Sequence, residues 1–137
     1  MSDFDALQRA VEASAHARRS ETRQCETLLT ALYQALRQAS GPGLPLNNVA
    51  MEPLHDPAQR LRPMPLGSFH AAWFRLGLCE VLVRVRRDGS GYLGEYGLNA
   101  QFRLAVGSDA ETQALARELL RTLTQLYADQ PPEKWTN

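Results

Sequence analysis

Histidines and cysteines are the side chains of this 137-residue chain with the most scope for catalysis or metal binding. The histidines are His16, His55 and His70, and no two of them have the i, i+3 or i, i+4 spacing of paired metal ligands on a helix. The cysteines, Cys25 and Cys79, do not form a CxxC pair. The sequence therefore predicts no metal site and no cofactor.

Cys79 and His70 could form a nucleophile pair, in which the histidine removes the proton of the thiol. The residues beside Cys79 do not match a thiol-protease signature, and such a pair needs a geometry that sequence distance does not establish. His70 could instead face Glu80 across a strand pair. We predict that the protein is not an enzyme. Two reduced, buried thiols are expected, with a single disulfide as the alternative.

The glycines around Ser90 predict a turn rather than a phosphate site. Gly89-Ser90-Gly91 lacks the strand–GxxxxGK[ST]–helix and GxGxxG contexts that cradle phosphates. With Asp88 before it, the segment is typical of a β-hairpin turn.

Alternating apolar residues on both sides of this turn predict a four-stranded antiparallel meander. The expected strands are 68–76, 79–87, 91–98 and 100–106. If Asp88-Gly89 is the turn, Val81 faces Tyr96; if Gly89-Ser90 is the turn, Val83 faces Tyr96. A further turn near residues 98–99 is expected to pair Tyr96 with Phe102. Either hairpin register gives the same core face: Val81, Val83, Val85, Tyr92, Tyr96, Phe102, Leu104 and Val106.

Two helices are expected to cover this core face, so the fold class is α+β. The first runs over about residues 3–39, with Ser2 and Asp5 as its capping pair. The second, over about 109–128, starts with a capping box of Ser108 and Glu111. Its expected core stripe is Leu115, Leu119, Leu120, Leu123, Leu126 and Tyr127.

The first helix has an apolar stripe at both ends but not in its middle. Between Val11 and Cys25 the only apolar residues are alanines. The helix therefore either breaks near Ser20 or projects with only its second half packed on the core. A projecting first half would suit dimerisation or partner docking.

Residues 41–66 are expected to be a proline-rich connector, which holds six of the eight prolines. A short helical turn is predicted from Asp56 to Leu61, and the apolar content suggests that the connector wraps around the body. We expect a single domain over residues 1–137. Its parts are the helix 1–40, the connector 41–66, the sheet 67–107, the helix 108–128 and a polar tail 129–137, in which Trp135 is an anchor or a docking residue.

The sheet face opposite the core face is the candidate binding surface. If Ala72, Phe74 and Leu76 point to the core, two aromatic residues join the arginines on the other face. Tryptophan and arginine are enriched at protein interfaces. The alternative is that the connector or the first helix covers this face. The expected partner-binding residues are Phe69, Trp73, Arg75, Leu82, Arg84, Arg86, Leu93 and Arg103.

Two classes of partner fit this surface. A protein partner or self-association suits its mixed charge and its leucines, whereas a single-stranded nucleic acid would stack bases on Trp73 and Phe69. The net charge of zero and the absence of an RNP-like motif favour the protein. The N-terminus does not resemble a signal peptide and no apolar run could span a bilayer, so we expect a cytoplasmic protein without membrane contact.

The order of the expected elements is similar to that of small bacterial accessory domains, such as secretion chaperones and immunity proteins. Secretion chaperones, however, tend to be acidic and to split their strands around a helix. The resemblance implies an architecture and not a function.

Overall fold

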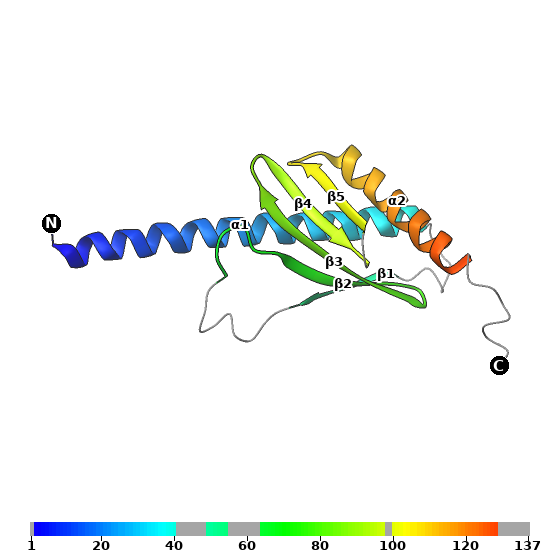
Figure 1. Cartoon of the computed structure of the whole chain (residues 1–137), viewed down its shortest axis with the longest axis horizontal. Helices are drawn as coiled ribbons and strands as arrows, with labels where there is room; N and C mark the ends of the chain where they lie inside the picture. The colour runs from blue at the N-terminus through cyan, green and yellow to red at the C-terminus, as the bar shows by residue number, and fades with distance from the viewer. Residues whose placement is uncertain (1, 41–48, 55–63, 98–99, 129–137) are drawn as a thin grey trace.

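A meander of five antiparallel strands lies against two helices in the computed structural model (Figure 1). The structure describes residues 2–40, 49–54, 64–97 and 100–128. The elements are α1 (Asp3–Ser40), β1 (Val49–Leu54), β2 (His70–Leu76), β3 (Cys79–Asp88), β4 (Gly91–Tyr96), β5 (Ala100–Ala105) and α2 (Asp109–Ala128). The strands follow one another in the sheet in chain order, β1-β2-β3-β4-β5. The α+β class is therefore confirmed, but the prediction of four strands was wrong.

The additional strand, β1, lies within the segment that the sequence indicated as a connector. It pairs with β2 from Val49 opposite Leu76 to Leu54 opposite Ala71. Pro53 argues against a central strand, because proline donates no hydrogen bond, but β1 is at the edge of the sheet, where proline is tolerated. Val49 and Met51 pack against the core. The helical turn predicted over residues 56–61 lies outside the described residues.

The hairpin between β3 and β4 has Gly89-Ser90 as its turn, one of the two expected registers. Asp88 faces Gly91 and Val83 faces Tyr96. The predicted pairing of Tyr96 with Phe102 was wrong, since Tyr96 faces Ala100 and Phe102 faces Gly94. The error is two residues along β4, and side chains alternate with a period of two, so Phe102 still points to the core face.

One hydrophobic core joins the sheet to both helices. Phe74 of β2, Leu119 of α2 and Leu36 of α1 have no exposed surface, and Leu32 of α1 is 1% exposed. Two tyrosines of β4 reach across this core: the Tyr92 hydroxyl donates to the Gln24 carbonyl of α1 (3.2 Å), and that of Tyr96 lies 3.2 Å from the Thr122 hydroxyl of α2. The valines of β3 expected in the core are Val81, Val83 and Val85, and all are buried.

The ends of β5 and α2 depart from the expected core. Val106 follows the last residue of β5 and is 52% exposed. Leu126 and Tyr127 in the last turn of α2 are 57% and 56% exposed. All three continue an apolar pattern to the end of an element, where the packed layers cover less than half of each residue. Their predicted burial was wrong for this reason.

Helix α1 is continuous through Ser20, and its first half projects beyond the sheet (Figure 1). Its start is capped as expected: the Asp5 amide donates to Ser2 Oγ (3.1 Å) and the Ser2 amide to Asp5 Oδ2 (3.3 Å). The Ser108 cap of α2 also forms, with the Glu111 amide donating to Ser108 Oγ. The carboxylate of Glu111, however, accepts from the Ala105 amide at the end of β5 (2.6 Å).

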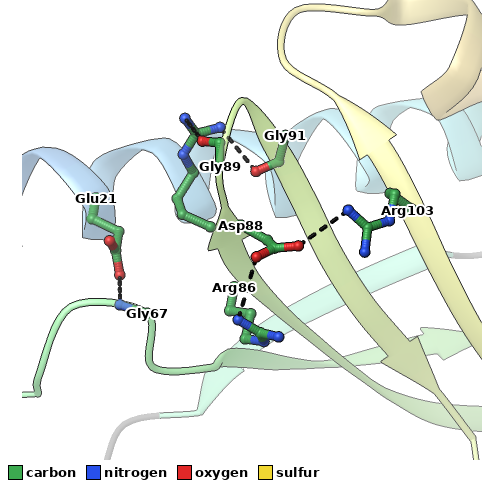
Figure 2. Close-up of polar contacts among 8 residues, drawn as sticks. Glu21, Gly67, Arg86, Asp88, Gly89, Gly91 and Arg103 are labelled. Atoms are coloured by element: carbon green, nitrogen blue, oxygen red, sulfur yellow. Dashed lines mark hydrogen bonds and ion pairs between the residues drawn. The ribbon is translucent and has the colours of Figure 1, made fainter.

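A polar residue in the middle of α1 fastens the chain that leads into β2. Glu21 Oε1 accepts a 2.7 Å hydrogen bond from the amide of Gly67 (Figure 2). Gly67 has a φ of +82°, a conformation that residues with a side chain rarely adopt. The polar stretch that interrupts the apolar stripe of α1 thus includes a structural contact to the β1–β2 connection.

Candidate functional site

The sheet face turned away from the helices is called the outer face below. Its residues follow from the alternation of side chains along the paired strands. On β2, Ala72 and Phe74 are buried in the core, so their neighbours Trp73 and Arg75 point to the outer face. The residues of the outer face are Ala50, Glu52, Leu54, Phe69, Ala71, Trp73, Arg75, Glu80, Leu82, Arg84, Arg86, Asp88, Leu93, Glu95, Gln101 and Arg103. All eight residues expected in the binding surface are among them.

Trp73 is the exposed aromatic residue of the outer face. It stands in the register between Glu52 of β1 and Leu82 of β3, and 42% of its surface is exposed. The residues on both neighbouring strands flank the Trp73 side chain, while part of its ring system remains exposed to water. Trp73 is thus held in place and still available to a partner.

An open pocket of about 310 Å³ adjoins Trp73. Its walls come from the first three strands of the sheet, and two carboxylates and one guanidinium give it mixed charge. The lining residues are Ala50, Met51, Glu52, Trp73, Arg75 and Glu80. The volume is at the lower end of the range for ligand pockets, about 300–1,000 Å³, and suits a single inserted side chain.

Phe69, the second predicted aromatic contact, is covered by arginines. The Arg84 guanidinium carbon lies 4.3 Å from the centre of the Phe69 ring, and that of Arg86 lies 5.7 Å from it. Both distances are in the range of cation–π attraction. The ring is half-buried, so Phe69 positions the arginines of β3 rather than offering a free stacking surface.

Carboxylates neutralise most of the predicted basic surface. Arg84 pairs with Glu95 of β4 at 2.5 Å. Asp88 lies between two arginines, 3.1 Å from Arg103 and 3.9 Å from Arg86 (Figure 2). These pairs are solvent-exposed, so each contributes about 0–1 kcal/mol to stability. Their larger effect is to fix the side chains and to remove a net positive field.

Two charged residues of the outer face were missed from the sequence. Glu52 is on β1, whose segment was interpreted as connector, and Asp88 was interpreted only as a turn residue. The alternation of Val49 and Met51 with Ala50 and Glu52 was the available signal for the first. Asp88 could have been placed by continuing the alternation of β3 from Arg84 and Arg86.

The suggested catalytic pair of Cys79 and His70 is not assembled. In the β2–β3 pairing His70 faces Val85, whereas Cys79 faces Leu76 at the other end of the strands. Six residues of strand separate the two positions, which corresponds to roughly 20 Å. The expected contact of His70 with Glu80 is also absent, because Glu80 faces Arg75.

The two cysteines are free thiols, and Cys25 is buried in the core. Burial raises the pKa of the Cys25 thiol to about 11, and the nearby carboxylate of Glu21 adds to this shift. The thiolate is the nucleophilic form of cysteine, so Cys25 is unreactive at neutral pH. The thiol of Cys79 lies 3.7 Å from the hydroxyl of Tyr127.

We predict that His70 makes the stability of the fold depend on pH. Burial lowers its pKa below the ordinary value of 6.5, although Glu21 and Glu26 act in the opposite direction. Below pH 6.5 the unfolded chain therefore binds a proton that the folded chain resists, and stability falls as the pH falls further. Urea denaturation of the wild type and of His70→Gln at pH 5 to 8 should show a smaller acid loss in the variant. Parallel curves for the two proteins would contradict this assignment.

Within residues 2–40, 49–54, 64–97 and 100–128 no cluster of three potential metal ligands occurs. Neither helix in that part of the chain has the length and hydropathy required to cross a membrane. Comparison with protein-family models, with curated proteins and with solved structures finds no match to this chain.

Proposed function

We propose that the protein is a non-enzymatic binding module that recognises another protein through its outer face. The observation that carries this proposal is the exposure of Trp73 beside a pocket with walls of mixed charge. Tryptophan is the residue type most often found at the energetic centre of protein interfaces, where it fills or flanks a pocket. The proposed centre of binding is Trp73, with Arg75 and Glu80 providing polar contacts at the pocket.

The ion pairs of the outer face favour a protein partner over a nucleic acid. Single-strand binders combine free arginines, which hold phosphates, with aromatic rings on which bases stack. Here Arg84, Arg86 and Arg103 already contact carboxylates, and the ring of Phe69 is covered by guanidinium groups. A protein partner needs neither feature, since it can insert a side chain beside Trp73 and leave the ion pairs in place.

Replacing Trp73 with aspartate should abolish partner binding and leave the fold intact. The substitution removes the large contact surface and puts a negative charge beside Glu52 and Glu80. The matched control is Leu126→Asp, the same kind of change at an exposed apolar residue on α2. Affinity purification from the cells that make the protein, with quantitative mass spectrometry, should show a protein retained by wild type and Leu126→Asp and lost from Trp73→Asp. Equal retention by all three would overturn the proposal.

Nucleic-acid binding is tested separately by fluorescence anisotropy with labelled single-stranded DNA and RNA. The expected result is no binding at low salt. Affinity that falls steeply with salt and disappears in Arg84→Glu/Arg86→Glu would instead assign the outer face to nucleic acid, because phosphate contacts release counterions.

A further inference from the structure

The first half of α1 is a second surface, independent of the outer face. The segment Asp3–Arg18, called the arm below, spans roughly 24 Å at 1.5 Å per residue. Phe4, Leu7 and Val11 are 65%, 57% and 51% exposed, although they are spaced like the buried side of a helix. The spacings of three and four residues put all three on one stripe of the arm, as in a two-helix coiled coil.

The charged residues that flank the apolar stripe of the arm differ in sign at its two ends. At 3.6 residues per turn, Asp3 and Arg18 are on the side of Phe4, Leu7 and Val11, whereas Asp5, Arg9 and Glu12 are on other sides of the helix. The Arg18 guanidinium donates a hydrogen bond to Ser14 Oγ of the same arm. A stripe with an acidic residue at its start and a basic residue at its end is complementary to a second copy of itself that runs in the opposite direction.

We propose that the arm pairs antiparallel with the arm of a second copy and forms a homodimer with two-fold symmetry. One alignment brings the apolar stripes together: Leu7 of each copy lies opposite Val11 of the other, and Phe4 lies opposite Ser14. In the same alignment Asp3 of one copy approaches Arg18 of the other at both ends of the pair. A parallel pair would instead place Asp3 beside Asp3 and Arg18 beside Arg18, which repel each other.

The apolar stripe and the charged residues that flank it are therefore both complementary to a second copy of the chain. A contact between two arms of this length is at the small end of specific interfaces, below about 1,200 Å². The dimer should therefore be reversible, with a population that rises with protein concentration. Its formation leaves the outer face accessible, so dimerisation and partner binding are separable.

Sedimentation-velocity ultracentrifugation over a concentration series tests the apolar stripe. The wild type should form dimers, and Leu7→Ser/Val11→Ser should weaken them by roughly a hundredfold or more, because apolar contacts are lost from both copies. The matched control is Ala6→Ser/Ala13→Ser, which places two serines on the opposite side of the same arm and should dimerise like the wild type. Circular dichroism establishes that both variants keep their helix content.

Charge reversal tests the direction of the pair. Asp3→Arg alone and Arg18→Asp alone should each be monomeric at concentrations at which the wild type dimerises, whereas an equimolar mixture should form dimers as stable as the wild type. Recovery in the mixture cannot come from helix propensity, since each chain keeps its own substitutions. A wild type that stays monomeric at all concentrations, or dimers that the arm variants leave unchanged, would overturn the proposal without affecting the proposed role of Trp73.

Discussion

Replacement of Phe74 by alanine should lower the free energy of unfolding by about 3–5 kcal/mol. Phe74 is fully buried between the sheet and the helices, and no neighbouring side chain can fill the space of its ring without leaving its own contacts. Domains of this size have a total stability of about 5–15 kcal/mol, so the loss would unfold a large fraction of a marginal protein. Urea denaturation followed by circular dichroism measures it.

Trp73→Ala is the matched control, because it truncates the adjacent aromatic residue on the opposite face of β2. Trp73 is 42% exposed, and its truncation should reduce stability by only about 1 kcal/mol. The difference between the two stability losses shows by experiment which residue belongs to the core face and which to the outer face. Comparable losses at positions 73 and 74 would contradict this assignment of the two faces.

Gly94→Ala should destabilise the centre of the sheet by about 3 kcal/mol. A Cβ atom at this position would lie 2.2 Å from Cζ of Phe102 and 2.7 Å from the carbonyl oxygen of Arg84. The ring of Phe102 occupies the space left by the missing side chain, directly across from Gly94 on β5. The new methyl group would therefore displace both the ring and the backbone of β3.

A double-mutant cycle identifies the cause of this effect. In a Phe102→Leu background, Gly94→Ala should cost less, because a smaller side chain can move away from the methyl group. Part of the cost should persist, since the Arg84 carbonyl belongs to the backbone and cannot rotate away. Additive losses at positions 94 and 102 would show that the ring does not depend on the glycine.

Periodicity alone was sufficient for most of the sheet and for both helices. The alternation of the β3 valines with arginines decided which face is buried, and this result does not change when the hairpin register shifts by two residues. Capping residues located the helix starts: Ser2 and Asp5 form the expected reciprocal pair, and Ser108 caps α2, although the Glu111 carboxylate bonds the Ala105 amide instead. These signals are local, so they can be read from neighbouring residues.

The errors concern features that depend on distant parts of the chain. β1 becomes a strand because the edge of β2 offers it hydrogen-bond partners, and Pro53 is tolerated only because β1 is outermost. Val106, Leu126 and Tyr127 have the right pattern for burial, yet more than half of the surface of each is exposed at the end of its element. The neutral character of the outer face depends on Asp88 meeting Arg103 from another strand, a contact between residues 15 positions apart.

Helix α1 has a buried half and an exposed half, and each half serves one of the two proposed binding surfaces. Its second half holds the sheet, with Cys25, Leu32 and Leu36 buried, and its first half carries the same apolar spacing without anything to cover it. A single helix thus both supports the outer face and extends a second binding element away from it. A dimer formed by two arms would present two outer faces to partners.

The most direct test of the outer face as a protein-binding surface is site-specific photocrosslinking in the cells that make the protein. A photoreactive phenylalanine analogue is introduced at position 73 and, as the control, at position 126 on α2. A discrete crosslinked product that contains a second protein species is expected at position 73 and not at position 126. No product at position 73, or the same products at both positions, would contradict it.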